Sequence, residues 1–503
     1  MYRLIESGTN NLTGGEVSVL PAGKMDPKNS LLLQNLVIGR DSKIHKALGY
    51  KPVHSNKIDT GLNGGIEFAY KDRKIHFAGG KGKIYRLGEN TLMQAYKSDS
   101  PETSTRRIHF AQMGDKFVAV NGDDVITYFQ NDSFHVKTNW DLLDNFLPDK
   151  PCVFKNRVWY INSKNKMEAM HSALQDPIKI EGYIDFSGVL PQADELIDIK
   201  VFLDFICFIF RNHILVYGGN TPSGENSDFY LYQMINLPGI LSSETNLNVG
   251  NYLFLATQNG IKNLQIIYPS TRISIGDFSE AIDTEVIRLI EDNKNEQYYT
   301  CGYWAKENLY FWVFENVAIV FNGTYKAFSR LVFPSEKSQW GGCYSDVAGN
   351  LNVLSGGYLH RYGNDYLFNG EEPLCIWKTG WLPLHPYGAT CFPKFADIMF
   401  GGSIAGGSVV VQAKVYNGDQ VSQPYAVGDD GVEYDTPVLE STMDTKQNYT
   451  WEEDFYMDSD FPIPLRVPLM NCGKFISLTI AEKKPVRGLE FSGITVYSER
   501  RSK

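Results

Sequence analysis

The sequence predicts an all-β protein: a β-propeller of about seven blade-like units, with an N-terminal arm before it and a β-sandwich-like domain after it. Three observations support this prediction, namely a recurring strand–turn–strand pattern, a composition suited to strands and turns, and scarce helical periodicity. Among 503 residues there are 29 Tyr, 29 Phe, 8 Trp and 45 Gly. Aromatic side chains favour strands and glycine favours tight turns, so the composition indicates a strand-rich chain.

One pattern recurs seven times between residues 65 and 375. A short apolar strand is followed by a polar turn, a second strand, another turn and a third strand. The first copy runs from Gly65 to Tyr70, turns at 71–73, and continues as a strand from Lys74 to Ala78. The units begin at residues 65, 108, 152, 199, 250, 302 and 342, a mean spacing of about 46 residues, which is the length of a propeller blade. A β-sandwich or barrel with similar hairpins is the alternative fold.

Helical periodicity is clear in only one segment. Ile282, Val286, Ile287 and Ile290 recur at helical spacing, and Ser279 stands where a helix cap is expected. We expect a helix over residues 279–290, inserted between the fifth and sixth units. A second, shorter helical turn is expected over residues 140–146.

The flanks of the repeat region lack its spacing. Residues 1–60 read as an extended N-terminal arm with a first strand, residues 61–375 as the propeller, and residues 376–503 as a C-terminal β-domain. Strands are expected at 395–400, 408–416, 475–480 and 488–497. A polar, acidic loop lies near 420–460 between them, and loops of this length are usually functional or disordered.

The charge balance bears on partners. The chain has 48 Lys and Arg against 58 Asp and Glu, a formal net charge of −10. This excludes a protein that grips nucleic acid over its whole surface, yet it suits a channel past which DNA slides without specific binding. The seven cysteines form no Cys-x-x-Cys pair, which argues against a disulfide framework. With no signal peptide and no membrane span visible, we expect a protein assembled in the cytoplasm.

Several short motifs have features of functional sites. Residues 79–83 have the look of a phosphate loop, but they lack its spacing and join two strands, so a hairpin turn is expected. The turn from Ser345 to Asn350 resembles the turn of sialidase-like propellers, which is structural. The nine histidines include no His-x-x-x-His pair, and no Gly-x-Ser-x-Gly is present.

Acidic residues suggest two kinds of site, a calcium-binding loop and a carboxylate pair for glycoside cleavage. Asp429, Asp430, Glu433 and Asp435 do not follow the order of a calcium loop, and a solvated loop is the expected state. Paired carboxylates for glycoside cleavage are not identifiable from sequence among so many acidic residues. We therefore predict no catalytic, cofactor-binding or metal-ligating residue and no cofactor, and we expect that the chain is not an enzyme.

A series of short motifs precedes the first unit. Gly14-Gly15 is followed by Leu33-Gln34-Asn35, a basic stretch and Gly49-Tyr50. The end of the chain carries strand-like segments over 473–480 and 488–497 and a basic pair, Arg500-Arg501. Together these features resemble the tail nozzle, tail hub and packaged-DNA stabilisation proteins of short-tailed bacteriophages. The chain departs from that pattern before Gly49, where the family typically has Arg.

The resemblance implies a structural virion protein of a phage tail, assembled in the host cytoplasm. In such a role the chain forms a homo-oligomeric ring, hexameric by resemblance, that continues the DNA channel below portal and adaptor. The ring helps to retain and eject the genome and anchors tail fibre or plug proteins. We expect the N-terminal arm and the last strands to make the oligomer contacts, because such segments add strands to a neighbour's sheet. The alternative is a glycan-binding or glycan-cleaving propeller of a phage or bacterium.

Overall fold

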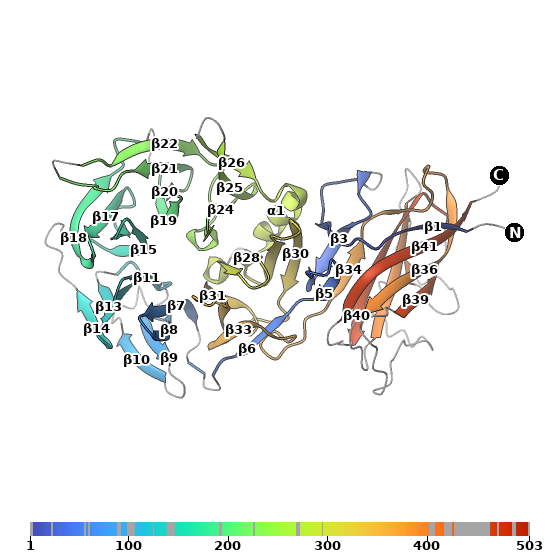
Figure 1. The fold of residues 1–503 in the computed structure, drawn as a ribbon, viewed down its shortest axis with the longest axis horizontal. Helices are drawn as coiled ribbons and strands as arrows, with labels where there is room; N and C mark the ends of the chain where they lie inside the picture. Colours follow the sequence, from blue (N-terminus) through green and yellow to red (C-terminus); the bar gives the residue numbers. More distant parts are fainter. Residues whose placement is uncertain are drawn as a thin grey trace.

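The fold is an all-β propeller joined to a β-sandwich (Figure 1). It is seen in a computed structural model, which describes residues 4–21, 24–54, 57–58, 61–87, 92–97, 106–123, 125–137, 146–190, 194–224, 227–267, 272–293, 295–401, 408–416, 425–426, 463–469, 472–484 and 489–500. Within these ranges no helix is long and apolar enough to cross a membrane.

The first four blades are antiparallel sheets of four strands each, in chain order. Short hairpins connect the strands. In the turn after β8, Lys81 and Gly82 both have positive φ, 50° and 67°, as a two-residue hairpin of the favoured twist requires. The strands are β7 (Leu62–Tyr70), β8 (Arg73–Gly80), β9 (Lys83–Leu87), β10 (Leu92–Lys97), β11 (His109–Met113), β12 (Lys116–Val120), β13 (Ile126–Gln130), β14 (Ser133–Lys137), β15 (Pro148–Phe154), β16 (Arg157–Asn162), β17 (Glu168–Ala173), β18 (Asp176–Asp185), β19 (Leu196–Phe202), β20 (Phe205–Phe210), β21 (His213–Gly218) and β22 (Tyr230–Asn236).

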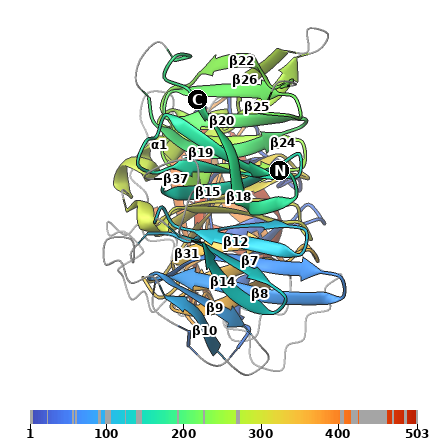
Figure 2. The same ribbon diagram turned by 90° about the vertical axis from the view of Figure 1, so that its left-hand side faces the viewer.

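Blades 5 and 6 continue the ring, and three strands of blade 7 follow. The short helix η2 (Ser243–Thr245) precedes blade 5. Between blades 5 and 6 lie η3 (Glu280–Ile282), the helix α1 (Asp283–Asp292) and η4 (Glu296–Tyr298), and Figure 2 shows α1 at one face of the propeller. The strands are β23 (Leu247–Val249), β24 (Tyr252–Thr257), β25 (Gly260–Ile267), β26 (Arg272–Asp277), β27 (Thr300–Trp304), β28 (Leu309–Phe314), β29 (Val317–Asn322), β30 (Ala327–Val332), β31 (Trp340–Ser345), β32 (Leu351–Ser355) and β33 (Tyr358–Asp365).

The N-terminal segment closes the propeller. Strand β6 (Gly49–Pro52) pairs antiparallel with β33 and forms the fourth strand of blade 7, with Tyr50 opposite Tyr362. Tyr50 is fully buried, stacks on Phe368 at 5.5 Å between ring centroids and donates a hydrogen bond to the carbonyl of Ser338. Blade 7 therefore holds the start and the end of the propeller together.

Two sheets form the C-terminal sandwich. One has the order β39-β36-β41-β5-β4, with β1 also paired to β41; the other continues blade 6 outward from β30 through β3, β34, β40, β37 and β38. Because β30 and β3 belong to one sheet, propeller and sandwich share a continuous sheet. The strands are β1 (Ile5–Thr9), β2 (Gly15–Glu16), β3 (Asn29–Gln34), β4 (Leu36–Ile38), β5 (Ile44–Lys46), β34 (Ile376–Thr379), β35 (Leu382–Pro383), β36 (Cys391–Gly401), β37 (Ser408–Tyr416), β38 (Tyr425–Ala426), β39 (Ile463–Pro468), β40 (Phe475–Lys484) and β41 (Glu490–Arg500).

The N-terminal segment differs from the extended arm that the sequence suggested. Its strands pair within the chain, β1 with β41, β3 with β30 and β34, and β5 with β41. Leu12, Leu33, Leu36 and Ile38 are buried in the sandwich core. Packing in this core removes the apolar surface of the four side chains from water. The segment is therefore a structural part of the sandwich.

The predicted helix begins later than expected. Residues 280–282 form a tight turn of helix, and α1 runs from 283 to 292. Its buried residues are Val286 and Leu289, whereas Ile287 is half-buried. Ser279 does not cap the helix; its hydroxyl accepts a hydrogen bond from the amide of Ile261 at 2.8 Å. The helical turn expected over 140–146 lies outside the described residues except for Phe146, and the acidic loop near 420–460 lies outside them except for β38.

Asn35 joins the propeller to the sandwich. It is 1% exposed and has a positive φ of 55°. Its side-chain amide donates to the carbonyl of Leu374 and accepts from the amide of Val332, both at 2.8 Å. Its backbone bonds to Arg330 and Ala47 at 2.8 and 2.9 Å. One residue thus binds the outer strand of blade 6 and two segments of the sandwich.

Replacing Asn35 with Ala is expected to lower the free energy of unfolding by about 3 kcal/mol. The amide of Val332 loses its partner, the carbonyl of Leu374 keeps only its longer bond from Gln34 at 3.3 Å, and alanine disfavours positive φ. Urea denaturation followed by tryptophan fluorescence measures the change. Asn35→Gly is the matched control, since it relaxes the backbone but loses the same two bonds, and should retain more stability than the alanine variant. A loss below 1 kcal/mol in Asn35→Ala would show that the junction does not depend on this residue.

Candidate functional site

The inner ends of the blades bring charged side chains together at the propeller axis. In Figure 1 the first strands of the blades, among them β11, β15 and β31, lie toward the middle of the ring, and β14, β18 and β22 lie toward its rim. Arg107 and His109 come from the start of blade 2, Asp149 and Lys150 from β15 of blade 3, and Glu244 from η2 before blade 5. We call these five residues the axial cluster.

Glu244 is the centre of the axial cluster. Its carboxylate forms ion pairs with Arg107 at 3.1 Å and with Lys150, and it lies 2.9 Å from Nε2 of His109. The side chains of these four residues are only 13–17% exposed. The acid is therefore shared by three basic groups from two blades, in a largely desolvated setting where charge interactions are strong.

Arg107 extends the cluster across the ring. Its guanidinium donates to the carbonyls of Tyr299 at 2.7 Å, Gly341 at 2.9 Å and Gln297 at 3.2 Å. These carbonyls lie at the inner ends of blades 6 and 7, whereas Arg107 precedes blade 2. Arg107 thus connects the inner ends of blades 2, 6 and 7.

A second charged group lies on blade 4. Asp198 is 2% exposed, and it accepts hydrogen bonds from Asn246 at 3.0 Å and from the amide of Ile199 at 2.9 Å. Its other contact is an ion pair with Lys200 at 3.2 Å. Asn246 follows η2, the element that carries Glu244, so this pair joins blade 4 to the same part of blade 5.

His109 lies between two carboxylates. Its Nδ1 is 3.0 Å from Asp149, and its Nε2 is 2.9 Å from Glu244 and 2.7 Å from Nζ of Lys150. Protonated, the imidazole donates to both acids; neutral, with the proton on Nδ1, its Nε2 accepts from Lys150. Burial and Lys150 lower the pKa of His109, but Glu244 and Asp149 outweigh them, so the pKa is raised.

The pKa values of the two acids are lowered, whereas that of His109 is raised. Burial alone raises the pKa of Glu244, but Arg107, Lys150 and His109 together hold it well below its ordinary value of 4.5. The pKa of Asp149 is also lowered, because His109 and Lys150 outweigh the effect of its burial. Both acids are therefore ionised at neutral pH, and the cluster is an arrangement of paired charges.

The raised pKa of His109 predicts a pH-dependent contribution to stability. The pKa of an unfolded histidine is about 6.5. A histidine whose pKa is higher in the folded state stabilises the fold fully at pH values below about 6.5. This contribution is lost as the pH rises through the pKa of the folded state. The difference in free energy of unfolding between the wild type and His109→Gln should therefore shrink from pH 6 to pH 9. Urea denaturation across this range measures it.

Taking the difference cancels the effect of other histidines. Burial lowers the pKa of His171, and it lowers that of His360 to about 4, so these residues destabilise the fold at acid pH in both proteins. His360→Gln is the control for the substitution itself. A wild-type advantage over His109→Gln that stays constant or grows with pH would contradict the assignment.

The axial carboxylates do not match the requirements of glycoside cleavage. Asp149 and Glu244 are paired through His109, but a glycosidase needs one acid with a raised pKa to protonate the leaving group. Here the pKa of each is lowered. The geometry supports a role for the cluster in holding the inner ends of the blades.

The motifs singled out in the sequence are turns. Residues 81–82 connect β8 and β9 as a hairpin, with no helix at the position that a phosphate loop requires. Asp346 closes the turn between β31 and β32, accepting from the amides of Ala348 at 3.0 Å and Asn350 at 2.8 Å. The four acids from Asp429 to Asp435 lie outside the described residues.

One group of potential metal ligands was not apparent from the sequence. Asp41 lies 2.7 Å from Nε2 of His45, and Glu490 lies 3.6 Å from Nδ1 of the same ring. Lys43 forms an ion pair with Glu490 and lies 3.7 Å from Asp41. The two acids face opposite nitrogens of the imidazole, and the ammonium of Lys43 contacts both acids. The group is therefore a network of ion pairs.

The sequence analysis does not predict the axial cluster, because its members are far apart in the chain. A signal was present: consecutive units begin with charged residues in otherwise apolar strands. Arg107 and His109 open the second unit, Asp149 and Lys150 precede the third, and residues 198–200 open the fourth with an acid and a base. Charges at the same place in successive units indicate a common position on the axis.

No family model and no curated protein matches the chain. Solved structures do. A streptogramin B lyase is similar over 63% of this chain and 98% of its own, with 12% identity and a TM-score of 0.43. An inactive variant of virginiamycin B lyase from Staphylococcus aureus, with quinupristin, is similar over 62% and 98%, with 11% identity and a TM-score of 0.43. The Cps50 (Swd1) β-propeller domain of Myceliophteria thermophila is similar over 61% and 98%, with 9% identity and a TM-score of 0.40.

These comparisons correct one expectation. The sequence analysis predicts that the chain is not an enzyme, whereas two of the similar propellers named above are lyases. The expectation is therefore withdrawn.

Proposed function

We propose that this chain is a structural protein of the tail of a short-tailed bacteriophage, a nozzle or hub subunit. Several copies form a ring, hexameric as the resemblance implies, that continues the DNA channel below portal and adaptor. The ring helps to retain and eject the genome and carries fibre or plug proteins. The observation that carries the proposal is the position of the motif residues in the fold.

The motif residues lie where the N-terminal segment meets the rest of the chain. A Cβ added to Gly15, whose φ is +70°, meets Cβ of Ala327 at 2.7 Å, and one added to Gly49 meets the carbonyl oxygen of Leu367 at 2.1 Å. Asn35 forms hydrogen bonds with both the propeller and the sandwich, and the strand that contains Tyr50 completes blade 7. The resemblance therefore concerns residues that this junction of propeller and sandwich requires, which supports a shared architecture.

The axial cluster bears on where DNA passes. Arg107 donates to carbonyl groups of blades 6 and 7, so ion-paired and hydrogen-bonded side chains connect the inner ends of the blades. In our proposal the DNA channel runs along the axis of the ring of copies, outside each propeller. A net charge of −10 suits a surface along which DNA slides without being held.

The second candidate is a glycan-binding or glycan-cleaving propeller. The carboxylates of Asp149 and Glu244 are already bound by basic side chains of the axial cluster, and their pKa values are lowered. This candidate would therefore bind a glycan through another surface of the propeller rather than cleave it. A glycan array with the purified chain tests this candidate directly.

The mass of the purified protein in solution tests the tail role. Light scattering should give a multiple, greater than one, of 56.8 kDa, alone or after mixing with portal and adaptor proteins. Negative-stain images of that species should show rings with a central hole. A monomer at all concentrations, with and without those partners, would contradict the proposal. A glycan signal from that monomer would then support the second candidate.

A further inference from the structure

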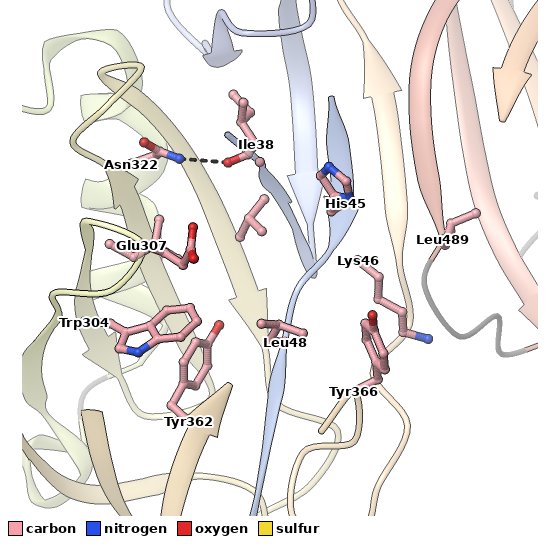
Figure 3. Close-up of a pocket in the computed structure, with 13 residues that line it drawn as sticks. Ile38, His45, Lys46, Leu48, Trp304, Glu307, Asn322, Tyr362, Tyr366 and Leu489 are labelled. Carbon is pink, nitrogen blue, oxygen red and sulfur yellow. Dashed lines mark hydrogen bonds between the residues drawn. The ribbon is translucent and has the colours of Figure 1, made fainter. Parts of the chain in front are cut away.

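A cavity of about 240 Å³ lies between the propeller and the sandwich. Figure 3 shows its walls, which come from blade 6, blade 7 and the N-terminal strands. Most of the lining is apolar or aromatic. The lining residues are Val37, Ile38, Gly39, His45, Lys46, Leu48, Trp304, Glu307, Leu309, Asn322, Tyr362, Tyr366 and Leu489.

Most polar groups of the lining already have partners in the protein. Asn322 donates to the carbonyl of Ile38 at 2.8 Å, as Figure 3 shows. The remaining pairs are Lys46 with Glu482 at 3.0 Å, Glu307 with Arg40 at 3.1 Å, and His45 with Asp41 at 2.7 Å. These groups are bonded within the protein and offer little to a charged ligand.

Tyr362 lacks such a partner and is also buried. The residue is 2% exposed, and its hydroxyl is buried without a hydrogen-bond partner. In Figure 3 the hydroxyl points into the cavity, between Trp304 and Leu48. The Trp304 ring meets the Tyr362 ring edge-on, with centroids 5.1 Å apart. Burial raises the pKa of Tyr362, so the group is a neutral phenol that needs a partner to satisfy its hydroxyl.

We propose that this cavity binds a small neutral ligand with one aromatic ring and one hydrogen-bonding oxygen, in the manner of a phenol. An apolar cavity of about 150 Å³ admits benzene, so 240 Å³ accommodates a single substituted ring. The aromatic walls suit a flat apolar ring, and Tyr362 supplies the bond to its oxygen. A sugar fits less well, because most of its hydroxyl groups would lack partners here.

The probe for this site is 4-fluorophenol, followed by ¹⁹F NMR with the full-length protein. We expect a saturable shift with a Kd below about 1 mM. Tyr362→Phe keeps the ring and removes the hydroxyl, so it should weaken 4-fluorophenol binding about fivefold while leaving fluorobenzene unaffected. Tyr387→Phe, at a residue that is 91% exposed, is the matched control and should bind as the wild type does.

A second variant fills the space. Leu48→Phe places a larger side chain in the cavity and should abolish binding of both probes, with circular dichroism confirming that it folds. The proposal is overturned if 4-fluorophenol gives no saturable shift at millimolar concentration. It is equally overturned if Tyr362→Phe binds 4-fluorophenol as tightly as the wild type, because the hydroxyl would then have water as its only partner.

Discussion

Removing residues 1–40 should abolish cooperative folding of the sandwich and leave a chain that aggregates. The deletion removes β1 to β4 and the buried side chains of Leu12, Leu33, Leu36 and Ile38. Each such side chain contributes about 2–3 kcal/mol by burial, a combined loss of about 10 kcal/mol, comparable with the whole stability of a typical domain. The exposed edges of β34 and β41 would then be free to pair with other copies.

Soluble yield, size-exclusion chromatography and thermal melting by circular dichroism measure the effect. Removal of residues 1–4 is the control, because it ends before β1 and Leu4 is exposed, and it should leave the melting temperature unchanged. A soluble monomer lacking residues 1–40 that melts like the wild type would contradict the account. It would instead favour the extended arm that the sequence suggested.

Replacing Glu244 with Gln should lower the free energy of unfolding by about 4 kcal/mol. The carboxylate is the shared partner of Arg107, Lys150 and His109, and removing one member of a buried ion pair leaves the others uncompensated. The pKa of His109 should fall in the same variant, because one of the two acids that raise it is gone. Urea denaturation and histidine NMR titration measure the two effects.

Glu195→Gln is the matched control for this substitution. Glu195 pairs with Lys166 at 3.1 Å and with Arg211 at 3.6 Å, but its side chain is 51% exposed, so the loss should stay below about 1 kcal/mol. Equal losses in the two variants would show that the axial cluster contributes no more than a surface ion pair. An unchanged pKa of His109 in Glu244→Gln would contradict the shared-acid arrangement.

The blades were predictable because their signals are local. Hairpin turns and apolar strands within each unit recur at blade spacing, and the structure has seven such blades. Closure of the ring was not predictable in the same way. Tyr50 pairs with Tyr362, and Asn35 contacts Val332 and Leu374, so these bonds join positions about three hundred residues apart, where no periodicity connects them.

The axial cluster was harder to predict than the blades. His109, Lys150 and Glu244 lie 41 to 135 residues apart in the chain, and only the ring topology brings them together. Taken singly, His109 and Lys150 are ordinary charged residues near the start of a strand, and Glu244 is an acid in a short helical turn. The contacts among these residues depend on the order of the blades around the axis. The pattern of residues within one strand gives no information about that order.

The most direct test of the tail role is imaging of the protein bound to portal and adaptor. Averaged electron-microscopy images should show a ring of copies with one hole on the common axis, and each propeller should be closed at its own axis by the side chains around Glu244. DNA density, when present, should run through the common hole. Complexes without a ring, or DNA passing through the middle of a propeller, would contradict the account.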